Sequence, residues 1–290
     1  MSLIIPPPKT QHIPCLDHGY VKFIEHWGSD ARIIETARTS TDKGFLGWGP
    51  QRCSCVRESL ADGMIIDRAD PDCPKCKGTG AVPGDEKLLK YLYEHRHSTP
   101  FEFAGLTIEV QAPLFIFRQW HRHRTQSYNE MSARYVPLPN VNYMPEVDRC
   151  IVVKGTGNKQ AGKVADRVPT HAEVLDWLEN YLQPAYDAAQ RSYDRGNEIG
   201  IPKELSRLSV NVARYTRMRA TANLRNWLAF LTLRRDSHAQ HEVQVYANAV
   251  GDFISNCYPK TWDLFVEGKM RDDWVMANKR KIDALMTADR

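Results

Sequence analysis

Residues 119–135, QWHRHRTQSYNEMSARY, contain the densest group of arginine, histidine and polar side chains in the chain. Just before them, an apolar alternation predicts a strand over 106–110. Pro113 suits the first turn of a helix, which we expect to run through the segment to about Arg124. Polar residues at 125–129 should break that helix. The sequence therefore predicts a strand followed directly by a helix that carries the arginines.

The residue types in this predicted helix favour nucleotide binding. Gln119, Arg122 and His123 are spaced i, i+3 and i+4, so one helix face would present all three to one ligand. Arginine binds phosphate through paired hydrogen bonds, serine hydroxyls add donors, and glutamine or glutamate can bind a base or sugar edge. The alternative, which an arginine-rich run alone would favour, is a surface helix with solvated arginines.

Helical and strand patterns continue on both sides of this segment. Residues 17–40 predict a strand, in which Tyr20, Lys22 and Ile24 alternate, and then a helix over 30–38. By the same patterns we expect a helix over 86–95 and a long helix from the capping box at 170–173 to about 197, which Pro184 should kink or split. We also expect a strand over 215–221. Three further helices are predicted from Pro202 to about 211, from Asn223 to 236 and over 237–256.

The apolar stripe at 227–231 and two stretches without periodicity complete the predicted organisation. Trp227, Phe230 and Leu231 share one helical stripe, which indicates the core. Residues 44–84 are rich in Gly, Pro, Asp and Cys and indicate an inserted module, and residues 137–168 an exposed excursion. We therefore predict one α/β (α+β) domain over 1–290, with a mainly antiparallel sheet, long helices and a small Cys-rich, zinc-ribbon-like insert.

Composition excludes several classes of protein. The 290 residues are 42% hydrophobic and 26% charged, which rules out a disordered or fibrous chain. The mean hydropathy is −0.51 and the longest apolar run, 227–233, is far shorter than the roughly 20 residues of a membrane span. No basic segment precedes an apolar core at the start, so we expect a cytoplasmic protein. A net charge of +4 is too small to require nucleic acid or an anionic membrane as partner.

Four of the seven cysteines fall in the insert. They form Cys53-Ser-Cys55, seventeen further residues, and Cys73-Pro-Lys-Cys76. In a cytoplasmic chain this clustering indicates a metal rather than disulfides, and four thiolates can close a structural zinc site that leaves no position for catalysis. The second pair and its following glycines also resemble the repeat of DnaJ-type zinc modules. The alternative is a set of free or redox-linked thiols.

Two motifs carry a resemblance to a known family. The order Arg122-His123-Arg124, seven residues, Ser132 resembles the signature of the flavin-dependent thymidylate synthases, and Asn129, Glu130, Arg134 and Tyr135 agree with it. Residues 223–242, NLRNWLAFLTLRRDSHAQHE, resemble the second ligand-binding helix pair of that family. Shorter matches lie at 17–19, 37–40, 97–102 and 204–207. The chain departs from the family at Val210-Asn211 and at Ala229, a flavin-contacting position where a larger polar residue is common.

The resemblance implies reductive methylation of dUMP to dTMP, with methylenetetrahydrofolate as carbon donor and FAD, reduced by NADPH, as hydride carrier. It implies that dUMP is bound by Gln119, Arg122, Glu130, Ser132, Arg134, Arg207 and Arg234. It also implies that FAD is bound by Thr99, Arg122, His123, Arg124, Glu130, Asn223, Arg225 and His238.

Arg234 is the catalytic residue that the resemblance implies. Its guanidinium would stabilise negative charge on the uracil ring when N3 loses its proton or hydride arrives at C6. His238 follows four residues later, so we expect it on the same helical face. Taken singly, Arg234 would be read as a surface ion pair and His238 as a structural histidine. Ser132 has no visible catalytic partner and the family implies no covalent nucleophile, so Ser132 is expected to bind substrate.

The resemblance also implies a homotetramer in which neighbouring chains share each active site. One alternative is a related enzyme that transfers a methyl or hydroxymethyl group to another pyrimidine nucleotide. An alternative from a different class is a zinc-containing nucleic-acid-binding protein, against which the near-neutral charge argues.

Overall fold

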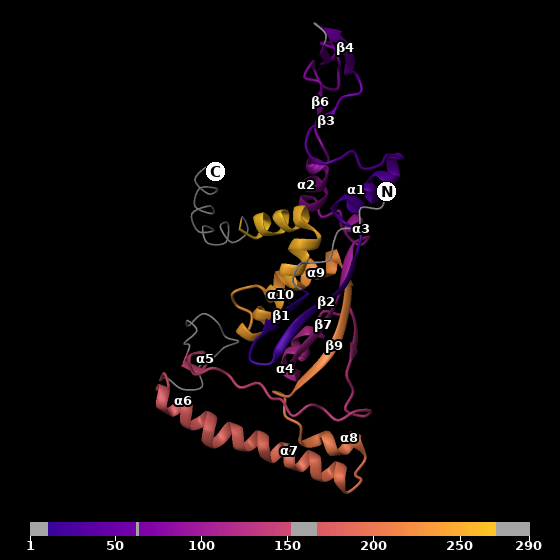
Figure 1. The fold of residues 1–290 in the computed structure, drawn as a ribbon. Coiled ribbons are helices and arrows are strands. Elements are labelled where there is room, and N and C mark those ends of the chain that lie inside the picture. Colours follow the sequence, from indigo (N-terminus) through magenta and orange to yellow (C-terminus); the bar gives the residue numbers. More distant parts are fainter. Residues whose placement is uncertain (1–10, 62–63, 152–166, 271–290) are drawn as a thin grey trace, which may run out of the picture.

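A five-stranded antiparallel sheet forms the centre of the protein (Figure 1). The computed structural model describes residues 11–61, 64–151 and 167–270. In sheet order the strands are β1 (His12–Cys15), β2 (Gly19–Trp27), β7 (Gly105–Pro113), β9 (Tyr215–Asn223) and β8 (Ser127–Glu130), and each neighbouring pair is antiparallel. The predicted α/β fold with a mainly antiparallel sheet is confirmed.

Side chains alternate across β7 and its neighbours because successive residues of a strand point to opposite faces. Leu106, Ile108 and Val110 are completely buried on one face. The other face is polar, and on it the Thr107 and Thr221 hydroxyls lie 2.9 Å apart. In the described residues the apolar side chains of β7 thus lie on one face and its polar, half-buried side chains on the other, as alternation predicts for an antiparallel sheet.

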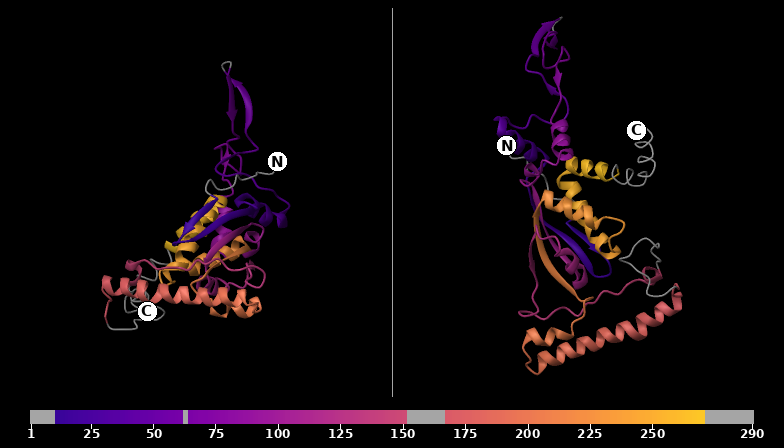
Figure 2. Two further views of the ribbon diagram at one scale, coloured as in Figure 1. Left: turned by 60° about the horizontal axis from the view of Figure 1, so that its bottom comes forward. Right: turned by 180° about the vertical axis from the view of Figure 1, so that it is seen from behind.

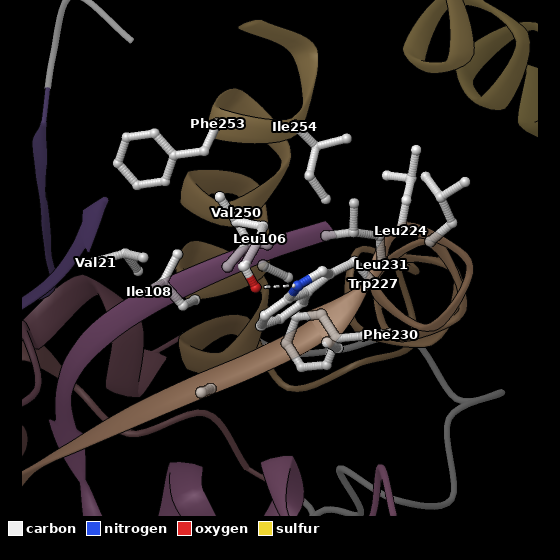
Figure 3. Packing of buried hydrophobic residues seen from close by; sticks show 14 of the residues in the cluster. Val21, Leu106, Ile108, Leu224, Trp227, Phe230, Leu231, Val250, Phe253 and Ile254 are labelled. Carbon is white, nitrogen blue, oxygen red and sulfur yellow. Dashed lines mark hydrogen bonds between the residues drawn. The ribbon is translucent and has the colours of Figure 1, made fainter. Parts of the chain in front are cut away.

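Helices α9 (Leu224–Arg234) and α10 (His241–Cys257) cover the apolar face (Figure 3). The Asn223 side chain caps α9 by accepting from the Asn226 amide, as predicted. The predicted core residues Trp227 and Phe230 are completely buried, and the Trp227 indole donates to the Leu106 carbonyl at 2.9 Å. This hydrogen bond fixes α9 against the central strand.

The remaining elements surround this core. The helices are α1 (Asp30–Arg38), α2 (Glu86–Glu94), α3 (Ser98–Phe101), α4 (Leu114–Trp120), α5 (Val147–Ile151), α6 (His171–Trp177), α7 (Gln183–Glu198) and α8 (Lys203–Ser206), with 3-10 turns η1 (Thr39–Thr41) and η4 (Arg207–Ser209). Residues 259–270 are also helical. The insert contains β3 (Gln51–Arg52), β4 (Arg57–Ala61), β5 (Met64–Arg68) and β6 (Ala81–Val82). No helix of the described residues is long and apolar enough to cross a bilayer.

The predicted helix from residue 170 to 197 is present and continuous, and an irregular turn rather than a split precedes Pro184. Thr170 and Glu173 form the expected capping box at the start of α6. A π-helical segment, η3 (Leu178–Leu182), then separates α6 from α7. Because proline has no N–H and its ring clashes with the carbonyl four residues earlier, the wider turn accommodates Pro184 without breaking the helix. The resulting long helix lies at the end of the sheet opposite the insert (Figure 2).

Several predicted boundaries are wrong. Helix α4 ends at Trp120 rather than near 124, and β8 forms where only a break was predicted, because the strand is stabilised by pairing with β9. The helix after Pro202 ends at Ser206, and α10 begins at His241 rather than at 237. Within the predicted excursion the structure places α5, while residues 152–166 lie outside the described residues.

Tyr258, which follows α10, joins that helix to the adjacent ends of strands β2 and β7. Its buried hydroxyl accepts from the Gly105 amide at 3.0 Å and donates to the Trp27 carbonyl at 2.8 Å. This hydroxyl is costly to remove, because the buried Gly105 amide then loses its partner away from water.

We therefore expect Tyr258→Phe to lower the free energy of unfolding in urea by about 1–3 kcal/mol. Tyr91→Phe is the matched control, because the Tyr91 ring is 50% exposed. Equal unfolding free energies for the two variants would contradict a structural role for the Tyr258 hydroxyl.

Candidate active site

Arg234 brings the two sequence motifs together. It is the last residue of α9, and its Nε donates to His123 Nε2 at 2.9 Å. A terminal guanidinium nitrogen donates to the Gln119 carbonyl, also at 2.9 Å. The predicted residues Gln119, His123 and Arg234 are therefore neighbours, although Arg234 lies 111 positions after His123 in the chain.

The Arg234–His123 contact requires a neutral imidazole. Burial, and secondarily the positive charge of Arg234, lower the pKa of His123 from 6.5 to about 4. Burial also lowers the pKa of Arg234, but a guanidinium remains protonated at neutral pH. His123 Nε2 thus acts as the acceptor, and Arg234 stays a cation in a half-buried position.

The predicted common helix face at 119–123 is not formed. Because α4 ends at Trp120, Arg122 and His123 lie in the turn that follows, where the His123 amide donates to the Trp120 carbonyl. Tyr128 of β8 stabilises this turn by donating to the His123 carbonyl at 2.7 Å. The ring of His123 in this turn contacts Arg234.

His238 is likewise not on a helical face with Arg234. Helix α9 ends at Arg234, and the Asp236 carboxylate then accepts from the His238 amide and lies 2.8 Å from its Nδ1. This local bond competes with continued helix and forms a turn. His238 is consequently exposed in the α9–α10 connection.

Gln240 is a site residue to which the sequence assigned no role. It precedes α10, and its side-chain oxygen accepts from Gln119 Nε2 at 2.6 Å. Its position inside the second motif was the available signal. The start of α10 is thereby tied to the same group as Arg234.

A second part of the site surrounds the start of α9. Arg225 is paired with Glu102 at 2.9 Å, and Asn226 donates to the Thr125 carbonyl at 3.0 Å. The Asn223 side chain is used as the helix cap, and Thr99 is exposed in α3. These contacts hold the 122–126 turn beside α9.

A cavity of about 560 Å³ lies next to Arg225. Ala229 and Thr232 of α9, His97 and Ser98 before and within α3, and residues of the helix over 259–270 contribute to its lining. Of the residues that the family resemblance implies for dUMP and FAD, Arg225 alone lines it. The small side chain at 229 leaves this wall of the cavity open.

The third group follows β8. Burial raises the pKa of Glu130 at the end of the strand. The Ser132 hydroxyl accepts from the Arg134 amide at 3.3 Å, and Arg134 lies 3.8 Å from the Glu204 carboxylate of α8. Within the described residues, no hydrogen bond or ion pair joins this group to Arg234.

Cationic side chains of the predicted site remain exposed. Arg122, Arg124 and Arg207 are exposed, and no carboxylate of the described chain pairs with them. Unpaired guanidiniums at a surface are available to bind phosphate. The predicted metal ligands Cys53, Cys55, Cys73 and Cys76 lie together in the insert, with their sulfur atoms within 4.8 Å of one another.

Comparison with known proteins identifies relatives over most of the chain. A family model described as "Thymidylate synthase complementing protein" matches residues 22–260. The chain is 33% identical over 252 residues to a flavin-dependent thymidylate synthase of Wolbachia pipientis wMel, covering 87% of this chain and 75% of that protein. It is 34% identical over 268 residues to the one of Rickettsia bellii (strain RML369-C), with coverages of 89% and 79%.

A solved structure agrees with these relatives. The UMP/dUMP methylase PolB from Streptomyces cacaoi, bound with 5-Br dUMP, superposes with a TM-score of 0.64 at 26% identity, over 88% of this chain and 97% of that chain. The family model spans both motifs, so the expected resemblance is confirmed. The chain belongs to the family of flavin-dependent thymidylate synthases.

Proposed function

We propose that this protein reductively methylates dUMP to dTMP, with methylenetetrahydrofolate as carbon donor and NADPH as reductant of FAD. The observation that carries the proposal is the contact of Arg234 with His123, which joins the two family motifs around one half-buried cation. Relatives named flavin-dependent thymidylate synthase and a solved UMP/dUMP methylase support it.

Arg234 would act on the uracil ring. A guanidinium that has already lost part of its hydration can stabilise negative charge as N3 loses its proton or as hydride arrives at C6. His123 and the Gln119 carbonyl position it by accepting two of its N–H groups, which leaves other donors for the substrate. In this role His123 is a positioning residue for Arg234.

The phosphate end of dUMP would be bound by the exposed guanidiniums. Arg122, Arg134 and Arg207 supply the charge, while Ser132 and Glu130 supply a hydroxyl and a carboxyl for the sugar or base. Because no hydrogen bond or ion pair in the described residues joins Glu130, Ser132 or Arg134 to Arg234, we propose that a site is completed between neighbouring chains of a homotetramer.

The residues present fit a flavin. Arg122 and Arg124 are exposed cations for its diphosphate, Arg225 lies beside the cavity, and the volume of about 560 Å³ is within the range of ligand pockets. We assign FAD contacts to these arginines and to Thr99, His123, Glu130, Asn223 and His238. The bound flavin would supply the hydride that converts the transferred carbon to a methyl group.

The same residues permit a second substrate. The solved relative PolB is named a UMP/dUMP methylase, so UMP is the specific alternative to dUMP.

As compartment we propose the cytoplasm, because Cys15, Cys150 and Cys257 are unpaired thiols, which suit a reducing environment.

Incubation of the protein with methylenetetrahydrofolate, NADPH and either dUMP or UMP tests the function directly. We expect dTMP from dUMP and a protein that binds FAD. Arg234→Ala should reduce turnover on the order of 10²–10³-fold or more while flavin absorbance is retained, because a charge-stabilising donor is lost. Arg195→Ala, which alters a surface pair with Glu198, is the control. No flavin binding after reconstitution would refute the assignment, whereas near-normal turnover of Arg234→Ala would show that another residue activates the uracil.

A shared site predicts complementation between inactive chains. Mixing Arg134→Ala protein with Arg234→Ala protein should restore part of the dTMP formation, because a hybrid site can then contain an intact Arg134 from one chain and an intact Arg234 from its neighbour. Subunit exchange is verified with a mass tag. Exchange without any recovered activity would show that each chain builds its own site.

The lowered pKa of His123 predicts a pH dependence of stability. The folded protein holds this imidazole neutral down to about pH 4, whereas the unfolded chain binds a proton near pH 6.5. His123 therefore does not reduce the stability of the folded state above pH 6.5, and its unfavourable burial lowers the free energy of unfolding as the pH falls from 6.5 toward 4. His123→Gln should lose less unfolding free energy between pH 7 and pH 5 than the wild type. His171→Gln, an exposed imidazole, should behave as the wild type, and identical pH profiles for all three proteins would contradict the buried neutral state.

A further inference from the structure

The insert is a separate structural unit at one end of the protein. It extends from the end of the sheet opposite α7 (Figures 1 and 2) and consists of two two-stranded sheets, β3–β6 and β4–β5. Its buried cluster is distinct from the main core and contains Cys53, Cys73 and Cys76, with Cys55, Val56 and Val82 packed against it. A cluster this small buries too little apolar surface to hold about 40 residues in one conformation.

The sulfur atoms have the spacing of ligands around one ion. Cys53 Sγ lies 3.8 Å from Cys73 Sγ, and Cys55 Sγ lies 3.4 Å from Cys76 Sγ. In a tetrahedral site with Zn–S bonds of about 2.3 Å, neighbouring sulfurs are about 3.8 Å apart. A disulfide would require about 2.05 Å.

Two turns present the sulfur pairs to each other. The Val56 amide donates to the Cys53 carbonyl at 3.0 Å, and the Lys77 amide to the Cys73 carbonyl at 2.8 Å. Lys77 and Gly78 then adopt positive φ angles of 51° and 81°, which reverse the chain after Cys76. Both ligand pairs are therefore held on tight turns of the backbone rather than on flexible chain.

We propose that Cys53, Cys55, Cys73 and Cys76 bind one Zn²⁺ ion that folds the insert and takes no direct part in the reaction. Four cysteine thiolates as the candidate ligands favour zinc over magnesium, calcium or manganese. Four protein ligands also fill a tetrahedral shell, which leaves no open position for a substrate.

The base of the insert is held without the cysteines. The buried carboxylate of Asp85 forms an ion pair with Arg38 of α1 and accepts from the Leu46 amide at 2.7 Å, while the Asp85 amide donates to the Gly47 carbonyl. Glu86 accepts from the Gly49 amide at 2.7 Å. Loss of the metal should therefore unfold the insert and leave α1, α2 and the rest of the protein in place.

Metal analysis of the full-length protein tests the site independently of its enzymatic function. We expect about one zinc per chain in wild-type protein prepared without chelator. The double variant Cys73→Ser/Cys76→Ser should lose that zinc and become sensitive to proteases between residues 44 and 84, with flavin binding unchanged. Cys150→Ser, which alters a half-buried cysteine outside the insert, is the matched control and should keep its zinc.

Chelation of the wild-type protein gives a second test that needs no variant. Removal of zinc should expose the same segment to proteases, and added Zn²⁺ should restore its protection. Metal-free wild-type protein with four freely titratable thiols in the insert, a Cys53–Cys73 or Cys55–Cys76 disulfide, or iron in place of zinc would each overturn the proposal.

Discussion

The indole N–H of Trp227 must find an acceptor inside the core, and the Leu106 carbonyl is that acceptor. A buried donor without a partner would cost about 1–3 kcal/mol, so this bond restricts how α9 can rotate on the central strand. Trp227 and Phe230 are buried in the core, Ala229 and Thr232 line the cavity, and Arg234 reaches His123 in the turn after α4. The placement of the candidate catalytic cation therefore depends on how the helix that carries it is packed.

The contact between Arg234 and His123 depends on the protonation of a single ring. An imidazolium at this place would put two cations about 3 Å apart in a half-buried site, which is strongly unfavourable. Burial keeps His123 neutral, so its ring can accept a hydrogen bond from the Arg234 cation instead of repelling it. Tyr128 of β8 holds the turn that positions the ring, so this strand contributes to the placement of His123.

Where local pattern decides the structure, the sequence was sufficient. The bounds of α1 agree because Asp30 and the apolar positions of 30–38 define one amphipathic helix, and the Asn223 cap agrees because capping is a local interaction. Pattern failed where a distant partner decides. Strand β8 is four residues long and is stabilised by its pairing with β9, which lies about 90 residues later in the chain. The sequence around 127–130 therefore does not show that a strand forms there. The family motifs identified Arg234 and His123, but their mutual contact required the fold.

The geometry at the base of the insert bears on which changes of sequence the fold can accept. A Cβ atom at Gly84 would collide with the Gly49 and Gly47 carbonyls, so the outgoing and returning segments cross at adjacent points of backbone. Chain ends that meet in this way tolerate the gain or loss of whatever lies between them. The enzyme body can therefore be inherited as one module and the cysteine-rich segment as another. Lineages could exchange, shorten or discard that segment without changing a strand of the sheet.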